Sequence, residues 1–466
     1  MNDPDPLLSN LFHPQVVHHV LASSTERVHC FESSGDDGGS LVWESDEMHP
    51  ATAPVVGGDQ VYVLASDGRI YELSLEDGHV LQDWTFALQG EPGNWLGYSD
   101  GLLVFRTGYS DLYGFHPATQ QQPWHRDIAF NPPVVGAGGR VYCADGWGTL
   151  HAVTSSGADA WTYGGPYNSN SPGAGTNIYR NPLPSGQWVY AKVLGSFWED
   201  VIRLTSSGHF SGKATQPEGY WNTGGYAIGP SVTEVIYEDA YEFNFETGVM
   251  RGWLYAFDFN GNTVWESPPV EPGTHWLYTD PVLDYSRLFV ASLGGDANYR
   301  LYAFDITSGL KVWQSEVPIG ADWDNLSDIV VECDGGPNVF IASQSGYLFA
   351  FSRTDGKLAW KAELQAGAGI DWYPRNPTSW CHTSWPHLPN VPNAIDPLAL
   401  ILPGWLYAAI HKPYPLPDKN LVRRIQALTQ GMPLEDKQRI RSRARVIGAY
   451  AELIDQAFGG DAGTQD

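Results

Sequence analysis

A segment of about 45 residues recurs along the chain, and this repeat constrains the fold more than any other feature of the sequence. Each copy contains an apolar strand, a polar turn that usually includes glycine, and a short second strand that ends in tryptophan. Because a short unit of this kind cannot bury its apolar residues alone, the copies are expected to stack on one another. Clear copies are GTLHAVTSSGADAW (148–161), GWLYAFDFNGNTVW (252–265), RLYAFDITSGLKVW (300–313) and GYLFAFSRTDGKLAW (346–360).

The closing tryptophans give the number of units. They follow one another at intervals of 37 to 48 residues, except for 104 residues between Trp161 and Trp265. The long interval contains two units, because residues 198–214 form a copy that keeps Gly208 and has lost its tryptophan. This gives eight units, and we expect the tryptophans to pack between neighbouring units. They are Trp43, Trp84, Trp124, Trp161, Trp265, Trp313 and Trp360.

Two further apolar segments precede each unit, so that every repeat contains four short strands. Segments such as QVYVLAS (60–66) and RLFVAS (287–292) each follow a short strand of the type PVV. Four strands in about 45 residues are typical of one blade of a β-propeller. The fold class is therefore all-β, an eight-bladed β-propeller of four-stranded antiparallel blades over residues 12–364. The PVV-like strands are Pro54–Val56, Pro133–Val135, Pro230–Val232 and Pro281–Leu283.

The repeat resembles the quinoprotein-like (PQQ-like) repeat of bacterial alcohol dehydrogenases and of the outer-membrane assembly lipoprotein. The shared pattern, PVV…VYV…G-x-LYAFD-x-x-(S/T)G-x-x-x-W, covers residues 15–364. The quinone-site features of the dehydrogenases are missing, since the sequence has no adjacent cysteines and no CxxCH haem motif. The N-terminus, MNDPDPLLSN, shows neither an export signal nor a lipid-attachment cysteine. We therefore expect no cofactor, no dehydrogenase activity and a cytoplasmic location.

Charge and cysteine usage limit the partners further. The chain has 53 acidic and 26 basic side chains, with a formal net charge of −27. Binding to phosphates needs a basic surface, so no nucleic-acid partner is expected. No stretch of 18 apolar residues occurs, which predicts no membrane span. Because Cys30, Cys143, Cys333 and Cys381 are far apart and form no CxxC pair, we expect buried free thiols rather than disulfides.

The loops that lead into the inner strand of each blade carry aromatic side chains and usually an acid. In a propeller these loops run along one face near the axis, so we expect an aromatic and acidic funnel there. Ring faces and carboxylates together suit a small molecule or peptide with a cationic or planar group, which makes the chain a binding module. The predicted ligand-binding residues are Trp95, Tyr179, Arg180, Trp221, Trp276, Trp323, Asp324, Asp371, Trp372 and Tyr373.

Two alternatives remain open for this funnel. The rings can instead plug the central channel and pack against one another. A cofactor-independent enzyme of the lyase or cyclase type could also use the funnel, with His275, Asp280 and Asp322 as catalytic residues, because histidine titrates near neutrality and a carboxylate can orient it. The longest departures from blade length, at 164–186 and 215–227, place the site near blades five to seven.

Two other clusters contain candidate metal ligands, but neither predicts a metal site. Cys381, His382 and His387 have loose ligand spacing without a fourth ligand. The acid-rich segment 234–246 is better explained as a solvated edge strand that charge protects from aggregation. Four of its acids share one face of a strand, namely Glu234, Glu238, Glu242 and Glu246.

The repeat ends after residue 364. Residues 365–417 are rich in proline and tryptophan and are predicted to form an extended strap, in which a strand at 400–410 can complete the first blade and close the ring. The apolar period then becomes helical, which predicts an α-helical hairpin over 418–459 and a disordered tail at 460–466. The basic run at 437–445 either docks on the acidic propeller or binds a protein partner.

Overall fold

The computed structural model describes residues 16–383, apart from gaps, and residue 437. Contacts divide the chain into two compact units, residues 19–380 and the two termini, 1–18 with 381–466. The helical hairpin, the tail and the strand predicted at 400–410 lie outside the described residues. Among those that are described, no helix is long and apolar enough to cross a membrane. The gaps are 36, 109, 122, 130–132, 137–138, 146–148, 165–177, 186–187, 195–198, 216–225, 230–234, 245–248, 271–278, 285, 295, 322–323, 334–335 and 366–377.

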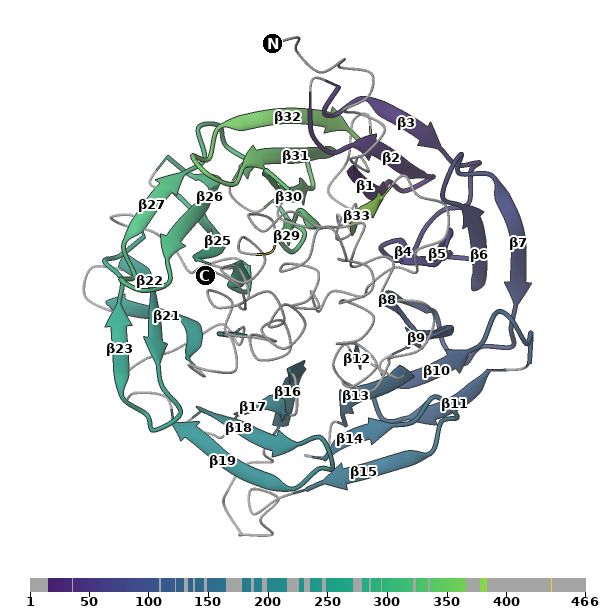
Figure 1. The fold of residues 1–466 in the computed structure, drawn as a ribbon, viewed down its shortest axis with the longest axis horizontal. Helices are drawn as coiled ribbons and strands as arrows, with labels where there is room; N and C mark the ends of the chain where they lie inside the picture. Colours follow the sequence, from purple (N-terminus) through teal and green to yellow (C-terminus); the bar gives the residue numbers. More distant parts are fainter. Residues whose placement is uncertain are drawn as a thin grey trace, which may run out of the picture. The chain divides into compact units, whose positions relative to one another are not determined.

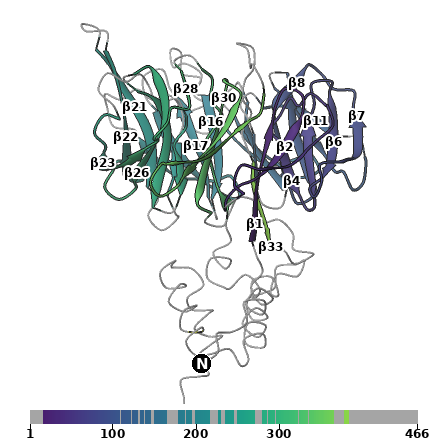
Figure 2. The ribbon, with the colours of Figure 1, turned by 90° about the horizontal axis from the view of Figure 1, so that it is seen from above.

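The repeat forms eight antiparallel sheets, which follow one another around a ring (Figure 1). Each sheet is a blade of four strands, and its inner strand is paired to the next strand outward. Seen from the side, the strands run between the two faces of the ring (Figure 2). Trp161 lies in blade 4 and Trp265 in blade 6, so the degenerate copy between them is a blade of its own. The eight-bladed fold is confirmed.

Seven blades take their strands from continuous segments. Blade 2 contains β4 (Val55–Gly57), β5 (Gln60–Leu64), β6 (Arg69–Ser74) and β7 (Val80–Thr85). Blade 3 contains β8 (Pro92–Ser99), β9 (Leu102–Thr107), β10 (Asp111–Phe115) and β11 (Trp124–Asp127). Blade 4 contains β12 (Val134–Gly136), β13 (Arg140–Ala144), β14 (Leu150–Val153) and β15 (Asp159–Tyr163). Blade 5 contains β16 (Ile178–Ser185), β17 (Trp188–Leu194), β18 (Glu199–Thr205) and β19 (Phe210–Thr215).

The later blades follow the same order. Blade 6 contains β20 (Tyr226–Ile228), β21 (Ile236–Asn244), β22 (Val249–Phe257) and β23 (Thr263–Glu266). Blade 7 contains β24 (Val282–Asp284), β25 (Arg287–Leu293), β26 (Asn298–Asp305) and β27 (Lys311–Gln314), and the short β28 (Gly320–Ala321) pairs with β26. Blade 8 contains β29 (Val330–Val331), β30 (Asn338–Ser343), β31 (Tyr347–Ser352) and β32 (Leu358–Glu363).

The first blade joins the two ends of the repeat region. It contains β1 (Val16–Ser23), β2 (Val28–Glu32) and β3 (Leu41–Glu44). Its fourth strand, β33 (Thr378–Thr383), pairs with β1 and takes the place that the inner strand has in the other blades. Thr378 Oγ1 also donates a hydrogen bond to Pro54 O at 2.6 Å. This closing strand lies ahead of the one predicted at 400–410.

The PVV-like segments form inner strands in three of the four predicted places. They correspond to β4, β12 and β24, each only three residues long. In blade 6 the inner strand is β20, which precedes the predicted segment Pro230–Val232, and the whole of that segment lies outside the described residues. The second and third strands are buried on both faces because a neighbouring blade covers each side.

The apolar core is divided among the blade junctions. One cluster of buried side chains lies at each of the eight junctions, and every cluster takes residues from two neighbouring blades. Blades 7 and 8, for example, meet through Phe289, Leu301, Ile341 and Phe351. Removing apolar area from water stabilises a fold by about 25 cal/mol per Å². Each blade is therefore stabilised mainly by the apolar contacts that it makes with its two neighbouring blades.

Six of the closing tryptophans form the same joint with the next blade. The ring lies against the turn glycine of that blade, and the indole N–H donates a hydrogen bond to a backbone carbonyl of the same turn. Gly309, for example, has a φ of 69°, and a Cβ added to it would lie 2.4 Å from Trp265 Cε3. The bonds join Trp43 to Leu75 (3.0 Å), Trp124 to Ser155 (2.9 Å), Trp161 to Ser206 (3.0 Å), Trp265 to Ile306 (2.7 Å), Trp313 to Arg353 (3.2 Å) and Trp360 to Ser33 (2.8 Å).

The joint between blades 2 and 3 lacks this hydrogen bond. Blade 3 carries Gln120 in place of the turn glycine, four residues before Trp124, and Gln120 keeps the left-handed backbone with a φ of 51°. Trp84 Nε1 has no hydrogen-bond partner among the described residues. The indole instead packs edge-on against Phe115, with ring centroids 5.1 Å apart. A change in the turn of one blade thus alters the tryptophan of the blade before it.

The cysteines differ in part from the prediction. Cys30 and Cys143 are buried free thiols, and burial raises the pKa of each to about 12. Cys333 forms a disulfide, so free thiols are the wrong expectation there. Disulfides are more typical of oxidising compartments, so the cytoplasmic location stays a prediction.

A pair of glycine substitutions tests the tryptophan joint. Gly309→Ala should lower the free energy of unfolding by about 1–3 kcal/mol more than Gly101→Ala, because overpacking a filled site costs that much. Both glycines have positive φ, 69° and 80°, so the backbone strain is matched, but nothing lies within 4 Å of a Cβ added to Gly101. Thermal and urea denaturation measure the difference. Equal losses in the two variants would contradict the joint.

Candidate functional site

Most of the predicted funnel lies outside the described residues. Asp280 is the one predicted catalytic residue that the structure describes. Tyr179 and Arg180 belong to β16, the inner strand of blade 5, but their side chains are not among those described. The residues outside the described part of the chain are His275, Asp322, Trp221, Trp276, Trp323, Asp371, Trp372 and Tyr373.

Two predicted ligand-binding residues have local structural contacts. Trp95 lies in β8 and packs with Val135 in the core between blades 3 and 4. Its ring covers Gly97, where an added Cβ would lie 2.7 Å from Trp95 Cη2. Asp324 closes a turn, since its Oδ2 accepts a hydrogen bond from the backbone N–H of Ala321 at 2.9 Å. These contacts account for both side chains without a ligand, so their binding role stays a prediction.

The acid-rich segment is not a solvated edge strand, and that prediction is wrong for the residues described. It forms β21, the second strand of blade 6, which pairs with β20 on one side and β22 on the other. Glu238 and Asp239 are each only 1% exposed. The four-strand order of the blade places this segment inside the sheet, and the neighbouring blades cover its faces. A buried carboxylate needs a partner, because an unpaired charge is expensive to remove from water.

Lys192 of the preceding blade supplies that partner. Its side chain comes from β17, is 0% exposed and places Nζ 3.4 Å from Glu238 Oε1. Tyr255 of β22 donates its hydroxyl to the other carboxylate oxygen, Oε2. Tyr226, Glu238 and Tyr255 lie in one row across β20, β21 and β22. An ion pair buried to this degree joins blades 5 and 6 with fixed geometry.

Two aspartates occupy equivalent positions in the next two blades. In blade 7, Thr279 Oγ1 accepts a hydrogen bond from the N–H of Ala291 at 2.9 Å. In blade 8, Ser327 Oγ accepts the equivalent bond from Ala342 at 2.8 Å. The residue after each hydroxyl is an exposed aspartate just ahead of the inner strand, Asp280 or Asp328. The repeat therefore brings two carboxyls to corresponding places on neighbouring blades.

The environment favours the neutral form of Asp280. Loss of surrounding water, and then repulsion by Asp328, raise the pKa of its carboxyl to about 6, although the positive charge of Lys192 opposes the rise. The side chain is exposed to solvent and yet largely surrounded by protein. No hydrogen bond or ion pair of Asp280 occurs within the described part of the chain. Burial raises the pKa of the Tyr226 hydroxyl well above its ordinary value, and the negative charges of Glu238 and Asp280 add to the rise.

We call these side chains the inner charge cluster. They come from four consecutive blades, and they include one buried ammonium group and three carboxyls. No group of three or more histidine, cysteine, aspartate or glutamate side chains that could hold a metal ion occurs among the described residues. The arrangement can bind a cation or exchange a proton at Asp280. The members are Lys192, Tyr226, Glu238, Tyr255, Asp280 and Asp328.

Sequence reasoning found Asp280 but missed Lys192 and the role of Glu238. A signal was present, because Lys192 is a lysine in the second position from the end of the apolar strand WVYAKV (188–193). A lysine among strand residues buried on both faces is rare unless it is paired. Its partner comes from another blade, and no local spacing reveals it.

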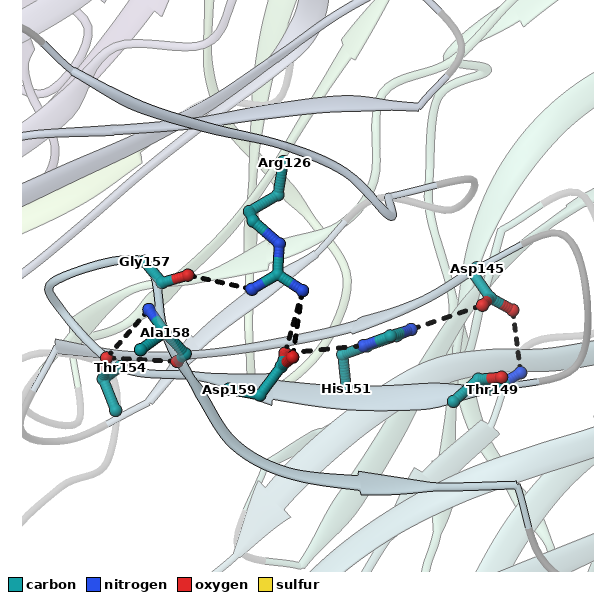
Figure 3. Close-up of polar contacts among 8 residues, drawn as sticks. All are labelled: Arg126, Asp145, Thr149, His151, Thr154, Gly157, Ala158 and Asp159. Atoms are coloured by element: carbon teal, nitrogen blue, oxygen red, sulfur yellow. Dashed lines mark hydrogen bonds and ion pairs between the residues drawn. The ribbon is translucent and has the colours of Figure 1, made fainter.

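A second polar network joins blades 3 and 4 (Figure 3). Arg126 donates two hydrogen bonds to the Asp159 carboxylate at 3.0 and 3.1 Å and one to Gly157 O at 2.9 Å. His151 lies between two carboxylates, with Nε2 3.3 Å from Asp145 Oδ2 and Nδ1 3.7 Å from Asp159 Oδ1. Arg126 stands two residues after Trp124 and binds the same turn of blade 4. The network therefore reinforces a blade joint rather than forming a separate site.

The chain is similar to several solved structures at low sequence identity. The computationally designed Ika8 protein is 14% identical over 69% of this chain and 89% of that chain, with a TM-score of 0.49. BamB from Moraxella catarrhalis is 14% identical over 75% and 84%, with a TM-score of 0.35. Dihydro-heme d1 dehydrogenase NirN in complex with DHE is 13% identical over 81% and 78%, with a TM-score of 0.51. At this identity the last structure shows a shared fold and nothing further.

Among curated proteins, none matches the chain. The PQQ-type repeat family described as outer membrane protein assembly factor BamB matches residues 14–131 and 247–375, which together are more than half of the chain. The chain belongs to this family. The BamB-family match omits residues 132–246, and this unmatched part contains Lys192, Tyr226 and Glu238. Half of the inner charge cluster thus lies where the chain departs from the family pattern.

A double-mutant cycle tests the buried pair. Lys192→Met should cost about 3–5 kcal/mol of folding free energy, because it leaves the Glu238 carboxylate buried without its cation. Adding Glu238→Gln should recover much of that loss, since the amide is neutral and can still accept the Tyr255 hydroxyl. Denaturant unfolding of the two single variants and the double variant gives the coupling energy. Strictly additive losses would contradict the pairing.

The raised pKa of Asp280 predicts a pH-dependent stability difference. The folded carboxyl titrates near pH 6 and the unfolded one near 3.8, so the folded state binds the proton more tightly between these values. The carboxyl therefore lowers stability increasingly as the pH rises through this range. Asp280→Asn should gain stability relative to the unaltered chain from about pH 4 to pH 6 and keep the gain above it. Melting temperatures across this range measure the effect.

Asp355→Asn is the control with the opposite sign. Asp355 accepts hydrogen bonds from Ser352 and from Lys357. These bonds, of which the one from Ser352 has the larger effect, lower the pKa of the Asp355 carboxyl to about 2. This variant should lose stability relative to the unaltered chain as the pH rises from about 2 to 4. A flat difference for Asp280→Asn between pH 4 and 6 would show that its pKa is not raised.

Proposed function

We propose that the chain is a binding propeller whose inner charge cluster takes a cationic group of a small molecule or peptide. The observation that carries the proposal is the pair Asp280 and Asp328. Loss of surrounding water, and then repulsion by the Asp328 carboxyl, raise the pKa of Asp280. A bound ammonium or guanidinium group would stabilise the ionised carboxyl of Asp280 and relieve that repulsion.

The buried pair supports the same proposal. Lys192 interacts at short range with Glu238, so much of its charge is balanced within the blade junction. The carboxyls of Asp280 and Asp328 add to the acidity of a chain whose formal net charge is −27. Carboxylates in a partly dehydrated concave site are screened less than those on an open surface. A cation therefore gains more there than elsewhere on the molecule.

We expect the predicted aromatic residues to favour a ligand that has a planar part as well as a positive charge. In the sequence, Trp276, Trp323 and Trp372 precede the inner strands of blades 7, 8 and 1, although all three lie outside the described residues. A ring face near a bound cation contributes about 0.5–2 kcal/mol. We infer a ligand that combines a positive charge with a planar part, and a cytoplasmic setting is part of the same proposal. The basic run at 437–445 is proposed as a separate protein contact.

A second candidate function has one observation in its favour. A carboxyl with a pKa near 6 is suited to transfer protons at neutral pH. Asp280 would then act as a general acid or base in a cofactor-independent lyase or cyclase, with His275 and Asp322 as the further predicted catalytic residues. Asp280→Asn would abolish turnover in that case, whereas a binding module has no turnover to lose.

Calorimetric titration with spermidine, as a polycationic probe, tests the binding proposal. At low ionic strength and pH 7.5, we expect one saturable site whose affinity falls at least tenfold in Asp280→Asn, which is a loss of about 1.4 kcal/mol. Affinity should also fall below about pH 6, because Asp280 then takes up a proton.

Asp355→Asn removes the same formal charge from an exposed turn of blade 8 and serves as the matched control. It should bind spermidine like the unaltered chain. An equal loss of affinity in the two variants would mean that the probe follows net charge and not the inner charge cluster.

A further inference from the structure

Blade 5 has lost the tryptophan that closes each of the other blades. In blade 4, Trp161 stands four residues after the turn glycine Gly157, and the same count from Gly208 in blade 5 leads to Gly212. Gly212 pairs with Arg203 of β18, whereas an alanine stands opposite the tryptophan in blades 4, 6, 7 and 8. The junction of blades 5 and 6 therefore lacks the indole that blade 5 would supply.

Blade 6 nevertheless keeps the turn that would receive this indole. The backbone N–H of Gly261 donates to the carbonyl three residues before it at 3.0 Å, as that of Gly208 does at 2.9 Å in blade 5. Ser206 O, two residues before Gly208, accepts the indole N–H of Trp161. The equivalent carbonyl in blade 6 is Phe259 O, and no hydrogen bond to it is present within the described part of the chain.

An open cavity lies where the indole is missing. Its volume is about 390 Å³, and its lining includes Arg203, Gly212, Phe259 and Asn260. A Cβ added to Gly212 would lie 3.7 Å from Arg203 Nη2 and 3.7 Å from Phe259 Cε1, so the cavity begins at the missing side chain. A protein cavity of roughly 150 Å³ holds a benzene ring. The cavity beside Gly212 therefore has room for the larger indole.

The charged groups around this cavity already have partners within the chain. The Arg203 guanidinium lies between two aromatic rings, 4.6 and 4.7 Å from their centroids. Lys213 Nζ is 2.7 Å from Asp200 Oδ2, and the Asp258 carboxylate accepts hydrogen bonds from backbone N–H groups of its own turn. A charged ligand would have to displace one of these partners, so the cavity favours a neutral group.

We propose that this cavity binds the indole of a tryptophan that a partner protein supplies. The ring would take the place of the missing closing tryptophan, against the ring of Phe259, and its N–H would donate a hydrogen bond to Phe259 O. A tryptophan side chain combines a large apolar area with one donor, and it often anchors a protein interface when it fills a pocket. The cavity involves neither Asp280 nor Asp328, so the site is independent of the inner charge cluster.

Saturation-transfer NMR with N-acetyltryptophanamide, an uncharged mimic of a tryptophan within a peptide, tests the site. We expect saturable binding by the full chain that does not change between low and high salt, because the ligand is neutral. The double variant Arg203→Ala with Gly212→Trp reproduces the residue pair of four other blades. It should weaken binding at least tenfold, because its own indole fills the cavity, and it should melt no lower than Arg203→Ala.

Three single variants show whether filling the cavity is the cause. Arg203→Ala alone should keep the binding, since alanine stands opposite the indole in other blades. Gly212→Ala adds only a methyl group at ordinary contact distance and should bind like the unaltered chain. Gly212→Ile fills the cavity with an aliphatic side chain and should lose binding, whether or not the double variant folds.

N-acetylphenylalaninamide distinguishes an indole site from a site for any aromatic ring. It should bind at least tenfold more weakly, because it has no ring N–H to donate to Phe259 O. Equal affinity for the two amides would overturn the assignment of an indole. The absence of saturable binding, or unchanged binding in Gly212→Ile, would overturn the proposal as a whole.

Discussion

Six of the seven closing tryptophans hold two blades together with one face of the indole and one N–H group, and the closed ring of blades depends on these joints. The indole can lie flat on the next blade only where a glycine leaves room for it, as Gly309 does for Trp265. The hydrogen bond from the indole N–H to the turn carbonyl then fixes the position of one blade relative to the next. Apolar clusters at every junction supply most of the stabilisation, and the joint sets their alignment.

A constant alignment has a chemical consequence near the axis. Equivalent positions of successive blades come to corresponding places, so two aspartates at the same repeat position must face the same space. Asp280 and Asp328 meet this condition, and the raised pKa of Asp280 is the electrostatic result. Where the repeat changes, the junction changes as well, as Gln120 does beside Trp84 and Gly212 beside Arg203. Asp280 and Asp328 thus follow from the regular repeat, whereas Gly212 and Arg203 mark a departure from it.

The sequence was sufficient for the architecture because the repeat is local. Tryptophan spacing predicted eight blades and located the degenerate one, although the closing strand is β33 rather than one at 400–410. The site was predictable only in part. Asp280 follows from its loop, but Lys192 and Glu238 belong to different blades, and burial in a junction leaves no spacing in the sequence. An acid-rich strand suggests a solvated edge, and only the strand order shows that Glu238 is covered.

The carboxyl pKa of Asp280 is the quantity on which the central claim depends. A ¹³C NMR titration of the aspartate side chains, assigned with Asp280→Asn, measures it directly. The account predicts a pKa of about 6 for Asp280, moving down in Asp328→Asn because one neighbouring negative charge is removed. A pKa near 4 that is insensitive to Asp328 would contradict the account, because the two carboxyls would then not share a site.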